Sequence, residues 1–247
     1  MDLVKHLQSA WKRHSLGSFV QLAVKNVVLY AKDAFSGRLF QKSAVQPSEF
    51  DSSLGVDTEE IRELWSLDVD AADNAAYAHR YQPSPHAFAT QAIKGLVIDH
   101  SRFTFVDFGA GKGRVLLIAA QWPFKAVFGV EFSRELCEIA SANLKKIPPE
   151  RCRAGRVECH HEDALRYALP DGPLVCYFYN PFTRPLMVDM VERLATDLKN
   201  NPREVYILYA QTDNRDLFDK QDFWEPIEST DFHVIYRARL DKLPTHA

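Results

Sequence analysis

An acidic residue and three glycines stand close together in the stretch 103–114, which reads F-T-F-V-D-F-G-A-G-K-G-R. Its first residues are apolar, aromatic or β-branched, as is typical of a buried parallel strand. Asp107 comes at the end of that run, and glycines follow at every second position, Gly109, Gly111 and Gly113. The residues after them are apolar and open a helix. Glycine permits positive φ and close approach to the backbone, so the stretch predicts a small-molecule site between a strand and a helix.

The spacing of the glycines indicates the class of ligand. Turns that bind dinucleotides have the pattern G-x-G-x-x-G and place a pyrophosphate at the helix N-terminus. Here the pattern is G-x-G-x-G, with Asp107 two residues before the first glycine. A carboxylate at that position repels a pyrophosphate and suits a ligand with an ammonium group. S-adenosylmethionine has an α-amine, a sulfonium, a ribose and an adenine but no phosphate, so we expect it as the cofactor. The alternative is a generic glycine turn.

Polar residues also follow the other predicted strands. Glu131 lies 24 residues after Asp107, and its carboxylate is expected to accept hydrogen bonds from both ribose hydroxyls. Asp163 is expected to accept from the adenine amine, and Tyr179-Asn180-Pro181-Phe182 closes a fourth strand. Each acid has a simpler alternative, since Glu131 and Asp163 are also suited to capping the next helix. Because ligands of open α/β sheets bind beyond the carboxyl ends of the strands, we expect these groups to converge.

The elements that position these residues alternate between strands and helices. The first predicted strand ends at Asp107. The other six cover 126–131, 156–159, 174–179, 204–209, 226–230 and 232–239. The predicted helices cover 87–98, the residues after Arg114, 133–144 and 185–198. The order specifies right-handed crossovers and a parallel sheet, whereas the short last connection implies antiparallel pairing. The fold class is therefore α/β, a doubly wound, seven-stranded, mostly parallel sheet with a C-terminal antiparallel hairpin.

The chain divides into two predicted parts. Residues 1–80 are expected to form a helical extension or cap, with helices before about residue 40 and a polar linker over 41–53. Residues 81–247 are expected to form the cofactor-binding domain. At its start, Ser84 is expected to cap the helix 87–98.

Composition limits the classes of function. The net charge is −3 and the sequence pI about 6.3, so no overall basic field recruits nucleic acid, which we consider an unlikely partner. The four cysteines form no C-x-x-C pair, which indicates free thiols in a reducing, cytoplasmic compartment. We expect no metal site, signal peptide or transmembrane segment. Composition leaves the oligomeric state open.

The chain resembles class I S-adenosylmethionine-dependent methyltransferases from about Tyr81 to Arg239. The matching motifs are D-F-G-A-G-K-G-R, G-V-E, E-D-A and Y-N-P-F. Together with Y-Q-P-S and F-D-S-S-L-G-V-D-T, they look most similar to a group of poorly characterised bacterial methyltransferases. A remote similarity extends to seven-strand protein-lysine methyltransferases. The resemblance implies a seven-stranded sheet and transfer of a methyl group to an acceptor.

The Y-N-P-F segment departs from the pattern of methyltransferases that act on adenine or glutamine, which have a small polar residue before Pro-Pro-Tyr. Asn180, with Tyr179, is expected to act on the acceptor, Asn180 by hydrogen-bonding it, and Phe182 is expected to line the methyl-transfer channel. Asn180, Pro181 and Phe182 are also expected to contact the cofactor; a simple turn is the alternative. Tyr81 is expected to close over the methionine end of the cofactor. The candidate bases are Tyr179, Tyr209 and His233. A protein amine is the expected acceptor, with a small molecule, or a catalytically silent cofactor-binding module, as alternatives.

Overall fold

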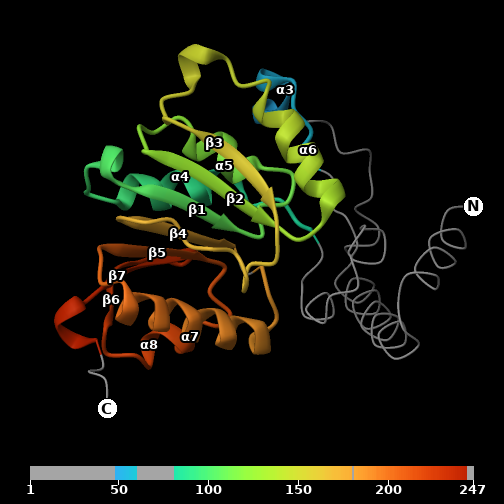
Figure 1. Cartoon of the computed structure of the whole chain (residues 1–247). Coiled ribbons are helices and arrows are strands. Elements are labelled where there is room, and N and C mark those ends of the chain that lie inside the picture. The colour runs from blue at the N-terminus through green and yellow to red at the C-terminus, as the bar shows by residue number, and fades with distance from the viewer. Residues whose placement is uncertain (1–47, 60–80, 180, 244–247) are drawn as a thin grey trace, which may run out of the picture.

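The computed structural model describes residues 48–59, 81–179 and 181–243, which form a seven-stranded sheet with helices on both faces (Figure 1). The strands are β1 (Thr104–Phe108), β2 (Ala126–Glu131), β3 (Val157–His161), β4 (Leu174–Tyr179), β5 (Val205–Ala210), β6 (Trp224–Ser229) and β7 (His233–Ala238). The helices are α3 (Glu49–Leu54), α4 (His86–Gly95), α5 (Arg114–Ala119), α6 (Arg134–Leu144), α7 (Arg184–Asn200) and α8 (Asp216–Asp219).

The strands lie in the order β3-β2-β1-β4-β5-β7-β6. The first five in this order pair in parallel, whereas β7 is antiparallel to both β5 and β6. This confirms the predicted mostly parallel sheet with a C-terminal antiparallel hairpin. The strand order reverses between β1 and β4, and the crevice beyond such a reversal is where ligands bind in open α/β sheets.

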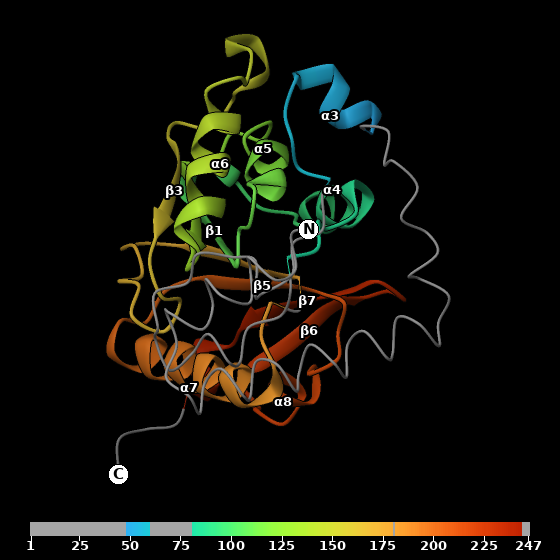
Figure 2. The ribbon, with the colours of Figure 1, turned by 90° about the vertical axis from the view of Figure 1, so that its right-hand side faces the viewer.

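Apolar residues fill a layer on each face of the sheet. Figure 2 shows α7 and α8 on one side of the strands and α4, α5 and α6 on the other. Val106 and Phe108 of β1 pack toward α7, and Phe105 packs toward α4 and α5. Because β4 is covered on both faces, it carries an unbroken apolar and aromatic sequence rather than an alternating one; β1 is buried throughout as well, and Asp107 is its one charged residue.

The outermost strand β6 shows the features expected of a sheet edge. Its side chains are mostly half-buried or exposed, and it contains Pro226, which has no N–H to donate. The register with β7 shifts between Pro226 and Glu228. An edge strand tolerates such irregularity because one of its sides lacks a neighbouring strand.

The structure corrects two local expectations. Ser84 does not cap α4, because Pro85 occupies the N-cap position and makes no side-chain cap; the Ser84 hydroxyl instead lies 2.8 Å from the buried Tyr177 hydroxyl. The predicted linker 41–53 is partly helical, since α3 begins at Glu49 and Ser48 caps it through the Asp51 N–H. The helices expected before about residue 40 lie outside the described residues.

Candidate functional site

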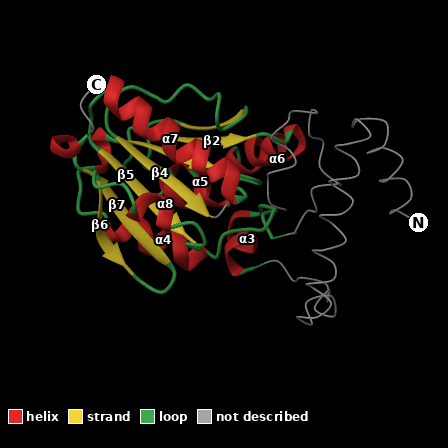
Figure 3. Ribbon diagram, turned by 90° about the horizontal axis from the view of Figure 1, so that it is seen from below, coloured by secondary structure: helices red, strands yellow, loops and turns green. Residues whose placement is uncertain are grey.

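The carboxyl ends of the parallel strands face the part of the molecule where α3 lies. In Figure 3 the arrowheads of β2 and β4 point toward this side. The glycine turn 109–113, which joins β1 to α5, lies at this edge. Gly109, Gly111 and Gly113 have φ angles of 82°, 53° and 83°, so the turn is left-handed at every second residue. The predicted strand–turn–helix unit is therefore present, and only glycine adopts this backbone without strain.

Two buried carboxylates lie beside the glycine turn. Asp107 is 3% exposed and Glu131 2%, and they come from neighbouring strands. The Gly111 N–H donates to Glu131 Oε2 at 2.8 Å, and the Ser133 N–H donates to Oε1 at 2.9 Å. Glu131 thus joins the end of β2 to both the turn and the start of α6. An ionised carboxylate has about four acceptor positions, so further donors can still be accommodated.

Burial makes both acids hard to ionise. Desolvation raises the pKa of Asp107 well above its ordinary value, and the nearby negative charge of Glu131 adds to the effect. Desolvation also raises the pKa of Glu131, to about 7, although the hydrogen bonds from Ser133, Gly111 and Phe132 oppose it. Among the residues that the structure describes, none donates a hydrogen bond to the Asp107 carboxylate. A buried carboxylate of this kind is stabilised by a cation or by donors on a ligand.

Tyr81 covers the glycine turn. A Cβ atom added to Gly111 would lie 2.1 Å from Tyr81 Cε2, so the ring occupies the space that a side chain would need. The Tyr81 hydroxyl donates to the Thr58 carbonyl oxygen at 2.8 Å. Tyr81 thus lies over the glycine turn, and its hydroxyl is already bound within the protein; its closing over the methionine end of the cofactor stays a prediction.

Sequence reasoning did not assign roles to the two cations of the glycine turn, Lys112 and Arg114. Both are buried, with side chains 0% and 7% exposed. They pair with three acids of the segment before Tyr81, namely Asp51, Asp57 and Glu59. Their charges are therefore neutralised within the protein, and the turn presents no free cation to a phosphate. The only sequence signal was the occurrence of two basic residues in a turn expected to bind no phosphate.

Asp163 follows β3 at the same edge of the sheet. It is half-buried, and its Oδ1 accepts from the Leu165 N–H at 2.8 Å. A turn and not a helix follows, so the helix cap that the sequence offered as an alternative is absent and the carboxylate caps a turn instead. Contact with an adenine amine stays a prediction.

The residues after β4 approach the glycine turn from the other side of the strand reversal. A Cβ atom on Gly109 would lie 2.7 Å from Pro181 Cβ, which shows how closely the two segments pack. Phe182 is 4% exposed and packs in the apolar layer beneath α7. Tyr179 is half-buried at the end of β4, and burial raises the pKa of its phenol. Asn180 lies outside the described residues.

The other two candidate bases are enclosed by the protein. Tyr209 is fully buried, and its hydroxyl accepts from the Asn214 N–H at 3.1 Å. His233 is 1% exposed, with Nε2 2.8 Å from Glu228 Oε1 and Nδ1 3.2 Å from Thr230 Oγ1. Of the three bases predicted from the sequence, Tyr179 is therefore the one with accessible surface.

Neither protein-family models nor curated proteins match this chain. Among solved structures, a magnesium protoporphyrin IX methyltransferase from Synechocystis with bound S-adenosylmethionine is 15% identical, with 62% of this chain and 78% of that chain covered and a TM-score of 0.46. An RNA methyltransferase from Salinibacter ruber in complex with S-adenosylhomocysteine is 18% identical, with 67% and 95% covered and a TM-score of 0.43. A protein described as a predicted adenine-specific DNA methylase from Listeria monocytogenes is 14% identical, with 63% and 51% covered and a TM-score of 0.48. At these identities and scores the likenesses concern the fold alone and identify neither a ligand nor a reaction.

Three further observations concern the described residues alone. No group of three or more His, Cys, Asp or Glu side chains in them is arranged to hold a metal ion. None of their helices is both long and apolar enough to cross a bilayer. All four cysteines are free thiols.

Proposed function

We propose that this protein is an S-adenosylmethionine-dependent methyltransferase. The observation that supports the proposal best is the pair Asp107 and Glu131, two buried carboxylates with raised pKa values beside the left-handed glycine turn. A cationic nucleoside without phosphate matches this site in charge. A dinucleotide does not, because its pyrophosphate would face two acids and no free lysine or arginine of the turn.

Each part of the cofactor has a candidate partner in this site. Asp107 would attract the ammonium group, and Glu131 would accept from the ribose hydroxyls through its remaining acceptor positions. Asp163 would accept from the adenine amine. The exposed Gly109 would let the ligand approach the turn, and Tyr81 would enclose the methionine end. Pro181 packs on Gly109, so the segment 180–182 would complete the pocket from the β4 side.

The cofactor, when bound, supplies a methyl group that the sulfonium already activates. The protein then needs to orient the acceptor in line with that group and to exclude water, which can contribute about 7–11 kcal/mol to lowering the barrier. Tyr179 at the end of β4 is suited to orienting the acceptor, and burial keeps its phenol protonated at neutral pH because its pKa is raised. It would therefore act first as a hydrogen-bonding group. We propose the same positioning role for Asn180.

An aromatic surface lies next to Tyr179. The Phe88 ring of α4 is 6.3 Å from the Tyr179 ring and stacks 5.0 Å from the Phe232 ring, which is 50% exposed. The turn that carries Phe232 also holds the exposed Asp231 and has no lysine or arginine. Gln211, at the end of β5, has a positive φ of 54° and donates its N–H to the Phe232 carbonyl oxygen at 3.1 Å.

This surface favours an acceptor that is apolar and carries a neutral or cationic group. A protein amine fits that description, and it is also what the remote similarity to protein-lysine methyltransferases implies. A protonated amine would have to lose a proton, to water or to a base, before its nitrogen attacks the methyl group. A small molecule with an aromatic ring is the second candidate, because the surface is largely aromatic. A module that binds the cofactor without transferring the methyl group is the non-enzymatic alternative.

Cofactor binding is tested by isothermal titration calorimetry with S-adenosylmethionine and, separately, NAD. We expect saturable binding of the first and none of the second. Asp107→Asn should weaken binding by about tenfold or more, because it removes the charge that attracts the ammonium group. Asp171→Asn, which changes an exposed acid away from the site, is the matched control and should bind normally. Binding of NAD alone would reject the proposal.

Transfer is tested with cofactor that carries a labelled methyl group. The protein is incubated with a lysate, which is then divided into protein, nucleic acid and small-molecule fractions. Label in the protein fraction that survives nuclease and disappears with protease supports the amine acceptor, and label in the small-molecule fraction supports the second candidate. Cofactor binding without label in any fraction supports the silent module.

A further inference from the structure

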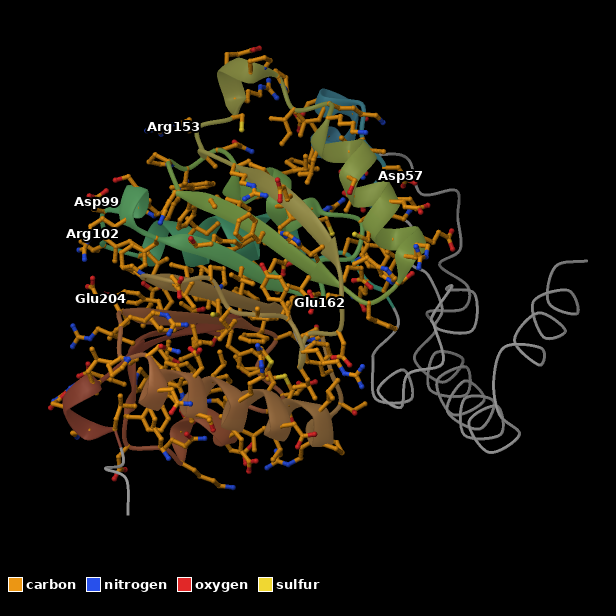
Figure 4. All side chains as sticks on the ribbon, viewed as in Figure 1. Asp57, Asp99, Arg102, Arg153, Glu162 and Glu204 are labelled. Carbon is orange, nitrogen blue, oxygen red and sulfur yellow. The ribbon has the colours of Figure 1, made fainter. Side chains whose placement is uncertain are left out.

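A short segment before Tyr81 is fastened to the back of the glycine turn. We call residues 48–59 the strap. It consists of α3, a left-handed Gly55 that ends the helix, and an extended stretch up to Glu59. Figure 4 shows Asp57 of the strap on the same side of the molecule as Glu162, which follows β3, and far from Arg102 and Glu204 at the opposite edge. The strap therefore lies at the ligand-binding edge of the sheet.

Arg114 holds both ends of the strap at once. Its Nε donates to Thr58 Oγ1 at 2.7 Å, and its Nη2 lies 3.3 Å from Asp51 Oδ1 and also pairs with Glu59. Asp51 in turn accepts from the Thr58 hydroxyl and the Thr58 N–H, each at 2.6 Å. Asp51 and Thr58 are 2% and 0% exposed. This closed network satisfies a buried cation and a buried acid together, which makes it costly to open.

A second attachment lies beside the first. Lys112 Nζ is 3.0 Å from each carboxylate oxygen of Asp57, and the lysine side chain is fully buried. Asn143 of α6 accepts from the Asp57 N–H at 3.2 Å and donates to the carbonyl oxygens of Asp57 and Lys112 at 2.9 and 3.0 Å. One amide side chain therefore bonds the strap and the glycine turn simultaneously.

The strap in turn fixes Tyr81. The Tyr81 hydroxyl donates to the Thr58 carbonyl oxygen, while the ring lies against Gly111. Removing the strap would leave this hydroxyl without its described acceptor and would free the ring to leave the turn. The chain of contacts thus runs from the glycine turn through its two cations to the strap, and from the strap back to the turn through Tyr81.

We propose that Lys112 and Arg114 are positioning residues: they hold the strap so that the strap and Tyr81 form a wall of the cofactor site. The two cations thus bind the protein's own acids and no phosphate of a ligand. It follows that cofactor binding and the order of the strap are coupled, since a ligand packed against Tyr81 stabilises the same contacts. This inference rests on the proposed function.

The coupling is tested in the full chain with Asp57→Asn and Tyr81→Phe. Each substitution removes one attachment of the strap and leaves Asp107 and Glu131 in place. We expect each to weaken S-adenosylmethionine binding about tenfold, within the range of coupling energies for residues in one network. Asp57→Glu keeps the charge and should restore most of the affinity. Glu204→Gln, which breaks the exposed Arg102–Glu204 pair at the opposite edge, is the matched control and should bind normally.

Hydrogen–deuterium exchange separates this inference from the proposed function. In the wild-type protein, the cofactor should slow amide exchange in residues 56–59, and Asp57→Asn should speed that exchange even without the cofactor. If the wild type binds and Asp57→Asn and Tyr81→Phe bind equally well, the positioning role is wrong. If the wild type does not bind S-adenosylmethionine but Asp57→Asn still speeds exchange, the proposed cofactor is wrong and the attachment stands. If the wild type does not bind and Asp57→Asn leaves the exchange of residues 56–59 unchanged, both the proposed cofactor and the attachment of the strap are wrong.

Discussion

The affinity for S-adenosylmethionine should increase as the pH rises toward neutrality, because Glu131 must lose its proton to accept from two ribose hydroxyls. Burial raises the pKa of this acid to about 7, against an ordinary value of 4.5. The ionised fraction then rises about fifteen-fold between about pH 5.5 and pH 7, and the apparent affinity rises by the same factor. Asp107, whose pKa is also raised, adds to the effect in the same direction.

The same raised pKa has the opposite consequence for stability in the absence of the cofactor. An acid with a raised pKa in the folded state stabilises the fold fully below its ordinary pKa, and this contribution is lost as the pH rises through about 7. For Glu131 the loss is about 3 kcal/mol. Ionisation of Glu131 therefore lowers the stability of the fold while it raises the affinity for the ligand.

The assay is calorimetric titration at intervals from about pH 5.5 to pH 7, a range below the pKa of the ligand's own α-amine. Glu131→Gln should bind more weakly and show a smaller pH dependence, because the amide does not titrate. Glu162→Gln, which changes an exposed acid of the same edge, should keep the wild-type slope. Urea unfolding of wild type and Glu131→Gln across pH 4.5–7 measures the stability difference. An affinity that is flat or falls as the pH rises would refute the reasoning.

Two further predictions concern packing around the site. Gly111→Ala should destabilise the fold by more than the roughly 1–2 kcal/mol of left-handed strain, because the new Cβ atom would meet the Tyr81 ring. Gly172→Ala is also strained by a positive φ, of 83°, but has nothing within 4 Å of the Cβ atom. Urea unfolding should therefore show a larger loss for Gly111→Ala, and equal losses would contradict the clash. Ser84→Ala should cost about 1–3 kcal/mol, because it leaves the buried Tyr177 hydroxyl without its partner. The double variant Ser84→Ala with Tyr177→Phe should recover part of that stability, measured by thermal unfolding. A further loss of the same size would count against the hydrogen bond between Ser84 and Tyr177.

Much of the sheet followed from local patterns. The strands 126–131 and 174–179 were predicted with both ends correct, because each consists of apolar, aromatic and glycine residues, with Glu131 at the end of the first. The hairpin was predicted because its two strands are separated by too few residues for a crossover. The predicted start of the edge strand β6 lies two residues after its observed start at Trp224. Trp224 is buried, although its neighbours on the strand are more exposed.

Local sequence patterns gave a wrong prediction where a side chain bonds to a residue far away along the chain. Ser84 satisfies the rule for a helix cap, yet its hydroxyl binds Tyr177, which is 93 residues away. α3 was predicted as linker because its sequence E-F-D-S-S-L is short and polar. Its cap at Ser48 and the buried Asp51, which pairs with Arg114 across 63 residues, favour the helical turn. Propensity rules do not include such contacts.

The sequence by itself determined which groups meet at the candidate site, because residue type and strand order place Asp107, Glu131 and the glycines at one edge of any parallel sheet of this kind. The tertiary structure decided which charges are available to a ligand. Lys112 and Arg114 are neutralised by acids more than 50 residues away, whereas Asp107 is buried with no described hydrogen-bond donor. The physical reason is that desolvation and ion pairing depend on distance in space, and the sequence gives only distance along the chain.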